Sequence, residues 1–384
     1  MTGSPADHRL IDCDLHNAVP SVEALFPYLP PYWREQISQT AFKGATESPY
    51  PKGAAVAARP DAAPPGGGPP GSDLDLLRAQ ALDAPGIELG ILNCVYAVDG
   101  VHNPDAAVAL ARAVNDWQVA EWLDREPRLR ASLVVPIQQP DLAAQEIERL
   151  GGHPGFVQVH LPARSAAPYG NRRYHPVFAA AVRHDLAVGI HFGGMPGVPP
   201  TPSGWSSYYL EDYVGMAHVM QSQLLSLVCE GTFDRFPALR VALIEGGVTW
   251  LPSFMWRLDK EWKGLRREVP WVRRLPSEYI HEHVRLTTQP LDAPPDRAQL
   301  LQVIEQLGSD DHLMYASDYP HRHDDEPDPA RWLGELPEPL ARKIGRENAR
   351  AFYRVGRSGS RAVGQERVGS EEDGERFGRG EEGE

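Results

Sequence analysis

The sequence predicts an α/β protein folded as a (β/α)8 barrel, the TIM barrel, and three observations lead to this prediction. Eight short apolar runs recur along the chain, and helical patterns separate them. The runs are nearly continuous rather than alternating, as in parallel strands that are buried on both faces. Strands that alternate with helices in this number are typical of the barrel, and a doubly wound open sheet is the alternative.

The apolar runs give the positions of the expected strands. They span residues 9–16, 87–95, 129–136, 155–161, 186–192, 239–246, 284–288 and 312–318. The expected helices span residues 103–125, 141–150, 174–184, 213–230, 249–267, 296–307 and 338–353. The first of these helices opens with Asn103 and Pro104, a capping residue and then a proline, which is typical of a helix N-terminus. No glycine-rich phosphate-binding motif follows any strand, so nothing in the sequence supports nucleotide binding.

Two segments are set apart from the barrel by their composition. The barrel is expected to form a single domain over residues 1–355. Within it, 18 of the 23 residues from Pro49 to Gly71 are proline, glycine or alanine. Such a segment cannot pack a core, and we expect a flexible insertion after the first strand. Residues 356–384 are rich in glycine and charged side chains, which predicts a disordered acidic tail.

The charge of the chain argues against two classes of partner. The sequence has 38 Lys and Arg against 52 Asp and Glu, a net charge of −14 at pH 7. Non-specific binding of nucleic acid or of an anionic membrane needs a basic surface, so neither partner is expected. The three cysteines are far apart, which argues against a disulfide framework. Because no signal-peptide pattern and no membrane-spanning apolar run occur, we expect a cytoplasmic protein.

Side chains that can bind a metal stand at the carboxyl ends of the expected strands, where TIM barrels carry their active sites. Asp14 and His16 end the first strand, His191 the fifth, Glu245 the sixth and Asp318 the eighth. Residues two apart on a strand point to the same face, so Asp14 and His16 can both point into the barrel mouth. Two imidazoles and two or three carboxylates predict a site for a divalent ion such as Zn or Mn.

Four residues are candidates for catalysis. Asp318 is the first candidate for taking the proton of a metal-activated water, and Glu245 is the second. His160 on the fourth strand or His218 in the helix after the fifth could stabilise an oxyanion or the leaving group. For both histidines, a structural role in packing or on a helix surface is the alternative.

The long segment 196–207 follows His191, and we expect it to form a lid over the site that contributes aromatic contacts. An ordinary surface loop is the alternative. The residues expected to bind a small-molecule substrate lie here, after the fourth strand and after Asp318. They are Trp205, Tyr208, Tyr209, Arg164 and His321.

These residues give the sequence a resemblance to a known family. Over about residues 9–355 it resembles the amidohydrolase superfamily, in the amidohydrolase-2 branch that includes aminocarboxymuconate-semialdehyde decarboxylase and related aromatic-acid decarboxylases. Asp14, His16, His191 and Asp318 match the metal ligands of that branch by order and by strand. The run LIEGGVTWLPSFMWRLDKEWKG and the segment ASDYPHRHDD resemble one of its large subgroups. The resemblance also implies a homodimer.

The sequence departs from the family pattern at Asp14 and at Glu245, and it lacks the bridging lysine of the binuclear members. Asp14 stands where many members have histidine, which favours a harder ion such as Mn beside Zn. Glu245 stands where the decarboxylases have a histidine that activates water. Binuclear members bridge two metals with a carboxylated lysine on the fourth strand, but no lysine lies between Lys52 and Lys260. One divalent metal ion, Zn or Mn, is therefore expected.

Three functions remain open from the sequence. The first is a mononuclear metal-dependent hydrolase, in which metal-activated water attacks a small amide, lactone or related carbonyl compound. The second is a non-oxidative, metal-dependent decarboxylase of an aromatic or unsaturated acid. The third is a metal-free barrel without catalytic activity. The hydrolase is favoured narrowly, because Glu245 replaces the histidine of the decarboxylases.

Overall fold

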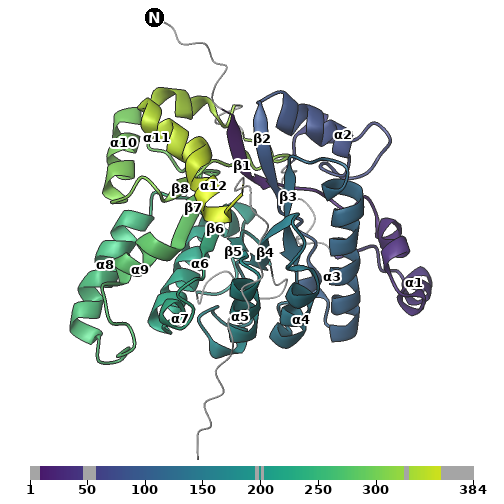
Figure 1. Cartoon of the computed structure of the whole chain (residues 1–384), viewed down its shortest axis with the longest axis horizontal. Coiled ribbons are helices and arrows are strands. Elements are labelled where there is room, and N and C mark those ends of the chain that lie inside the picture. The colour runs from purple at the N-terminus through teal and green to yellow at the C-terminus, as the bar shows by residue number, and fades with distance from the viewer. Residues whose placement is uncertain (1–8, 46–57, 195–198, 200–202, 324–327, 356–384) are drawn as a thin grey trace, which may run out of the picture.

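The computed structural model describes residues 9–45, 58–194, 199, 203–323 and 328–355. Its centre is a sheet of eight parallel strands in the chain order β1 to β8 (Figure 1). The strands are β1 Leu10–Leu15, β2 Ile87–Leu92, β3 Leu129–Val134, β4 Phe156–Pro162, β5 Ala187–His191, β6 Val241–Ile244, β7 Val284–Thr287 and β8 Leu313–Met314. The segment after β8 pairs with β1, since the Cys13 N–H donates to the Tyr315 carbonyl at 3.0 Å and Leu15 forms a parallel bridge with Tyr319. The predicted TIM barrel is confirmed.

Helices surround the strands. They are α1 Pro31–Ser38, α2 Leu74–Leu77, α3 Pro104–Gln118, α4 Pro140–Leu150, α5 His175–Arg183, α6 Tyr209–Cys229, α7 Thr232–Arg235, α8 Leu251–Leu265, α9 Pro276–His283, α10 Arg297–Gln306, α11 Glu338–Arg342 and α12 Asn348–Tyr353. The start of α3 follows the sequence, because the Asn103 side chain accepts hydrogen bonds from the N–H groups of Asp105 and Ala106. The helix expected at 338–353 is divided, with a π-helical turn at Lys343–Glu347 between α11 and α12.

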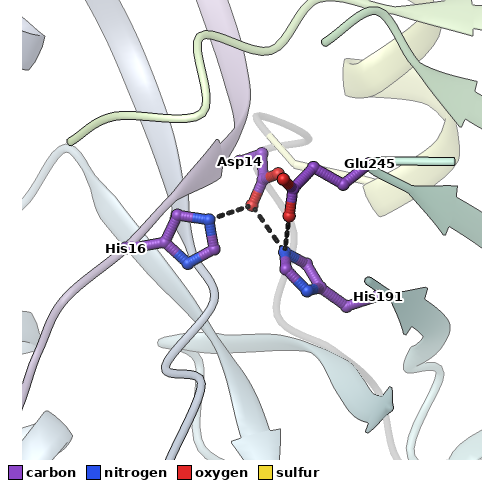
Figure 2. A group of neighbouring side chains, drawn as sticks. All are labelled: Asp14, His16, His191 and Glu245. Carbon is purple, nitrogen blue, oxygen red and sulfur yellow. Dashed lines mark ion pairs between the residues drawn. The ribbon is translucent and has the colours of Figure 1, made fainter. Parts of the chain in front are cut away.

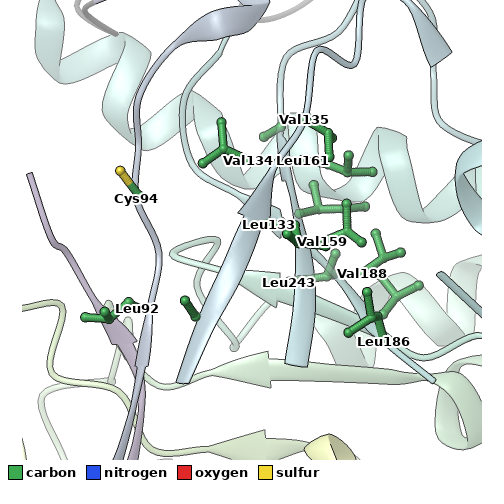
Figure 3. Close-up of a cluster of buried hydrophobic side chains, with 14 of the residues drawn as sticks. Leu92, Cys94, Leu133, Val134, Val135, Val159, Leu161, Leu186, Val188 and Leu243 are labelled. Atoms are coloured by element: carbon green, nitrogen blue, oxygen red, sulfur yellow. The ribbon is translucent and has the colours of Figure 1, made fainter. Parts of the chain in front are cut away.

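The barrel wall is buried on both faces, as its continuous apolar strands predict. All seven residues of β4 are buried. One cluster joins strand residues such as Val159, Val188 and Leu243 to residues of the surrounding helices (Figure 3). A second, smaller cluster joins Ile11 of β1 and other strand residues to Phe352 of α12. Because both faces of the wall are packed, the strand ends are held in place, and so are the functional side chains that they carry.

Part of the segment expected to be flexible lies ordered against the barrel. Residues 49–57 fall outside the described residues, but Ala58 forms an antiparallel bridge with His321. The Arg59 N–H donates to the Pro320 carbonyl at 2.8 Å, and the Ala18 N–H donates to the Gly71 carbonyl at 3.0 Å. Backbone hydrogen bonds to the loops after β1 and β8 thus hold a stretch whose composition cannot form a core. The tail at 356–384 lies outside the described residues.

Within the described part of the chain, none of the helices combines the length and the apolar composition that a membrane crossing requires.

Candidate metal centre

Residues from three strand ends meet at the mouth of the barrel. The Nε2 atom of His191 lies 3.4 Å from an oxygen of Asp14 and 3.4 Å from an oxygen of Glu245 (Figure 2). The Nε2 atom of His16 lies 3.5 Å from the same Asp14 oxygen. All four side chains are buried, and their ligand atoms lie within 4.8 Å of one another. The structure therefore brings together the strand ends that the sequence singled out.

Asp318 joins this cluster from the segment after β8. Its Oδ1 atom lies 2.9 Å from His16 Nε2 and 2.6 Å from His321 Nδ1. Its Oδ2 atom lies 3.4 Å from His323 Nε2. His16, Glu245, Asp318 and His321 form a second set of ligand atoms within 4.8 Å, which overlaps the first. Three histidines thus surround one carboxylate at the edge of the centre.

Outer hydrogen bonds orient the two imidazoles of the first set. The Nδ1 atom of His16 lies 3.0 Å from the Asn93 carbonyl, and the Nδ1 atom of His191 lies 2.7 Å from the Phe192 carbonyl. A carbonyl only accepts, so Nδ1 carries the proton in both rings. The Nε2 atoms are then the ones that face the carboxylates. This arrangement, in which one ring nitrogen donates to a backbone carbonyl and the other points at the centre, is typical of metal-binding histidines.

Three buried atoms in the cluster have no hydrogen-bond partner. They are Asp14 Oδ2, His191 Nε2 and Asp318 Oδ2. Buried polar atoms are normally paired, and leaving one unpaired costs free energy. A divalent cation among carboxylate oxygens and imidazole nitrogens would satisfy all three, and such mixed N/O donors suit Mn and Zn. The residues therefore fit one divalent metal ion.

The charges of the cluster shift the pKa values of its members. Burial alone would lower the pKa of His16, but the carboxylates of Asp14 and Asp318 outweigh burial and raise the pKa to about 9. Burial alone would raise the pKa of Asp318, but His321, His16 and His323 hold it well below its ordinary value. A metal ion must displace the proton from His16 Nε2, so metal affinity falls as the pH falls.

His160 lies beside the centre and is buried. Its ring centroid is 5.3 Å from that of His191, and its Nε2 atom has no hydrogen-bond partner. Burial lowers the pKa of His160 well below its ordinary value, and the neighbouring His191 and His16 act in the same direction. A neutral imidazole is therefore expected here, next to the metal ligands. The catalytic role suggested for His160 by the sequence stays a prediction.

The predicted substrate-binding residues lie in two different surroundings. Arg164 is buried and forms an ion pair with Asp212 on α6, so it is already neutralised. Tyr209 is the first residue of α6. Burial raises the pKa of its hydroxyl, and the charges of Glu245 and Asp212 add to this effect, so the side chain lies near the carboxylates of the centre. Trp205 is 56% exposed and Tyr208 is 72% exposed.

His218 is also exposed, on the surface of α6. It belongs to neither set of ligand atoms found among the described residues. The alternative reading of His218 as a helix-surface residue accounts for this position. Half of the expected lid, at 196–198 and 200–202, lies outside the described residues.

Two residues near the centre were missed from the sequence. Asn93 directly follows β2, and its side-chain amide donates to Asp14 Oδ1 at 2.9 Å. Tyr213 on α6 packs against Phe192, with ring centroids 5.1 Å apart. Burial raises the pKa of Tyr213, and the carboxylates of Glu245 and Asp318 add to this effect. The rule that strand ends carry function could have found Asn93, whereas Tyr213 lies within a helix and had no such signal.

Comparisons with known proteins agree with this geometry. The amidohydrolase family model matches residues 11–355. The chain is 27% identical over 308 residues to gamma-resorcylate decarboxylase from Rhodococcus jostii, which covers 74% of this chain and 89% of the relative. It is 29% identical over 304 residues to gamma-resorcylate decarboxylase from a Polaromonas species, with coverage of 74% and 89%.

Solved structures show the same fold. A dihydroxybenzoic acid decarboxylase from Polaromonas, with bound manganese and the inhibitor 2-nitroresorcinol, is 25% identical with a TM-score of 0.64, and the match covers 91% of this chain and 98% of that one. A 5-carboxyvanillate decarboxylase from Novosphingobium aromaticivorans with bound manganese has a TM-score of 0.68 at 21% identity, with coverage of 92% and 99%. The match of the family model over nearly the whole barrel, together with the ligand cluster at its mouth, shows that the chain belongs to the amidohydrolase family, in its amidohydrolase-2 branch.

Proposed function

We propose that this protein is a metal-dependent decarboxylase that removes carbon dioxide from a hydroxylated aromatic acid. The observation that carries the proposal is the similarity to gamma-resorcylate decarboxylases along 89% of their length, combined with a buried cluster that fits one metal ion. The sequence alone favoured a hydrolase, with decarboxylation as the alternative. The comparisons favour decarboxylation instead, because gamma-resorcylate decarboxylases from several bacteria align with 74% of this chain.

Asp14, His16, His191 and Asp318 are the residues that would hold the metal ion. Manganese is favoured over zinc, since carboxylate oxygens suit Mn and two of the solved relatives contain manganese. When bound, the ion would neutralise the negative oxygens of the substrate and fix the ring in the barrel mouth.

The reaction needs a proton, and the chain has a pair of residues to hold it. In a decarboxylation the bond between the ring carbon and the carboxylate breaks, its electron pair stays on the ring carbon, carbon dioxide leaves and the carbon takes up one proton. The charge of Asp318 outweighs burial and raises the pKa of His321, so His321 is held protonated against Asp318 Oδ1. We assign the storage of this proton to His321 and its transfer to the ring carbon to Asp318, whose carboxylate takes the proton from His321 as the carbon becomes basic.

Glu245 and His160 complete the wall of the site. Glu245 lies 3.4 Å from His191 Nε2, where its charge helps to keep that imidazole oriented towards the centre. The neutral His160 can donate a hydrogen bond to an oxygen of the substrate without adding charge. The rings of Tyr209 and Tyr213, whose centroids are 5.9 Å apart, provide an aromatic surface near the carboxylates. These features suit a flat, anionic ring.

A panel of substrates distinguishes the two enzymatic functions. Manganese-loaded protein is incubated with hydroxybenzoic acids, lactones and amides, and carbon dioxide and hydrolysis products are both measured. The expected result is carbon dioxide from at least one hydroxybenzoic acid. In deuterated water, the product should carry one deuterium at the ring position from which the carboxylate was removed. Asp318→Asn should lower the rate by a factor of about 100 or more, because it removes the carboxylate that transfers the proton. Hydrolysis of a lactone or amide without carbon dioxide from any acid would overturn the proposal.

Metal analysis distinguishes an enzyme from a metal-free barrel. Protein purified without chelator is expected to contain close to one equivalent of metal, and His191→Ala should lose it while circular dichroism stays unchanged. His218→Ala is the matched control, since that histidine is exposed on α6 and belongs to neither set of possible ligand atoms among the described residues. An unchanged metal content in His191→Ala would refute the ligand assignment. The homodimer stays a prediction, which sedimentation analysis can check.

A further inference from the structure

We propose that Asn93 is the positioning residue that sets the orientation of both metal ligands from β1. It lies immediately after β2, beside the end of β1, and its side chain is fully buried. The inference concerns the metal centre on which the proposed function rests, and it does not depend on which reaction that centre performs.

Asn93 contacts four consecutive residues of β1 and its end. Its backbone N–H donates to the Leu15 carbonyl at 2.7 Å, and its own carbonyl accepts the Nδ1 proton of His16 at 3.0 Å. The side-chain Nδ2 donates to Asp14 Oδ1 at 2.9 Å and to the Cys13 carbonyl at 3.3 Å. One residue therefore fixes the ring orientation of His16 and the rotation of the Asp14 carboxylate.

The amide of Asn93 is itself held in one orientation. Its Oδ1 atom accepts from Ser132 Oγ at 2.6 Å and from Gln158 Nε2 at 3.1 Å. Both protons and both lone pairs of the amide are then used, which is the full capacity of an asparagine side chain. A rotation that exchanged its oxygen and nitrogen would lose all four hydrogen bonds in a buried setting. The donor towards Asp14 is therefore fixed.

This orientation decides which oxygen of Asp14 faces the metal position. Oδ1 receives the amide proton of Asn93, and the same atom lies 3.5 Å from His16 Nε2 and 3.4 Å from His191 Nε2, so Oδ1 is the oxygen that faces the imidazoles of the centre. A carboxylate oxygen that is held by one donor keeps its remaining lone pair for a cation in a defined direction. Outer-shell partners of this kind tune metal affinity and ligand geometry.

The anchoring continues through the interior of the barrel to the last helix. Gln158 Nε2 also donates to Ser132 Oγ at 2.9 Å, and the Tyr353 hydroxyl on α12 donates to Gln158 Oε1 at 3.1 Å. Gly189 on β5 leaves the room that Gln158 needs, because a Cβ at that position would lie 2.4 Å from its amide. A column of buried polar groups thus supports Asn93 from β3, β4 and α12.

The experiment measures manganese binding to metal-free protein by calorimetry and by the electron paramagnetic resonance spectrum of the bound ion. Asn93→Ala is expected to raise the dissociation constant about 10- to 100-fold and to change the spectrum at saturating manganese. Asn115→Ala is the matched control. Asn115 is also fully buried, and its amide makes four hydrogen bonds, to Val134, Glu146 and Gln118, away from the ligands.

The comparison separates positioning from general stability. If Asn93→Ala stays folded but binds manganese within threefold of the wild type, or if Asn115→Ala weakens binding as much, the proposal is overturned. Should Asn93→Ala fail to fold, Ser132→Ala decides, since it removes the 2.6 Å anchor of the amide without touching a ligand. At least threefold weaker binding then supports the proposal, and unchanged binding refutes it. Absence of manganese binding in the wild type would instead refute the metal-dependent function.

Discussion

Glu245 and Asp318 share the left-handed backbone conformation, with φ angles of 60° and 57°, at two strand ends of the same barrel mouth. Residues with a side chain rarely adopt this conformation, because the Cβ atom crowds the neighbouring carbonyl. Both carboxylates belong to the second set of possible ligand atoms, which also contains His16 and His321. Two strained backbones therefore direct two carboxylates into one site, which is a common property of functional sites.

The strain at Glu245 predicts a reversal of the usual order of stability. Glu245→Gly should be more stable than Glu245→Ala by about 1 kcal/mol, because glycine adopts a positive φ without the steric cost. At Lys263, on the exposed part of α8, alanine should be the more stable of the two, as in ordinary helices. Urea unfolding of the metal-free variants measures both differences. The same order at both positions would contradict the strain at Glu245.

The close approach of Gly71 to His16 predicts a second effect. A Cβ on Gly71 would lie 2.5 Å from the His16 carbonyl oxygen, whereas one on Gly67 would meet nothing within 4 Å. Both glycines have a positive φ, at 81° and 88°. Gly67→Ala should therefore cost only the backbone strain, about 1 kcal/mol. Gly71→Ala must also displace the backbone of a metal ligand, and about tenfold weaker manganese binding is expected from calorimetry.

The buried His312, paired with the half-buried His281, predicts a loss of stability in mild acid. His312 Nε2 lies 2.7 Å from His281 Nδ1, and its Nδ1 atom lies 3.3 Å from the Val284 carbonyl. Burial lowers the pKa of His312 to about 3, and His281 and Arg285 act in the same direction. The unfolded chain takes up a proton near pH 6.5 and the folded chain does not, so stability is lost as the pH falls from 6.5 towards 3.

At pH 5 this loss amounts to about 2 kcal/mol relative to pH 7. The measurement compares the free energy of unfolding at the two pH values for the wild type and His312→Asn, with chelator present so that metal release does not contribute. The decrease should be about 2 kcal/mol larger in the wild type. Equal decreases in the two proteins would show that His312 is not the group that titrates.

The ion pair of Arg164 and Asp212 predicts a large cost when one partner is removed. Both side chains are 3% exposed, and the pair joins the segment after β4 to the first turn of α6. Arg164→Ala should destabilise the protein by about 3–5 kcal/mol, because it leaves a buried unpaired carboxylate. Replacing both partners, as Arg164→Met with Asp212→Leu, should recover most of this loss. Breaking the exposed pair Lys260–Glu261 is the control, and no measurable loss is expected there.

The fold could be predicted because its signals are local. Each strand is an apolar run bounded by polar residues, and the alternation with helices restricts the topology to very few arrangements. The same property indicated which side chains could bind a metal ion, because a barrel brings its strand ends together at one mouth. Asp14, His191 and Glu245 are far apart in the chain, yet an oxygen of Asp14 and an oxygen of Glu245 each lie 3.4 Å from His191 Nε2.

Other features depend on contacts that no local pattern encodes. Residues 58–71 have the composition of a flexible segment, but backbone hydrogen bonds to Ala18, Pro320 and His321 order them. The sequence suggested that Arg164 binds substrate, but in the structure Arg164 forms an ion pair with Asp212, which lies far along the chain. Such pairings depend on which side chains face each other across the folded barrel.

The sequence by itself therefore determined the barrel and the set of side chains at its mouth, since each strand and its end can be recognised from a short run of consecutive residues. It left the reaction open, and the similarity to decarboxylases favours the decarboxylase over the hydrolase. Only the tertiary structure decided how the ligands are held. The fixed amide of Asn93, the strained carboxylates of Glu245 and Asp318, and the histidines around Asp318 arise from distances across the closed barrel, which the order of residues along the chain does not specify.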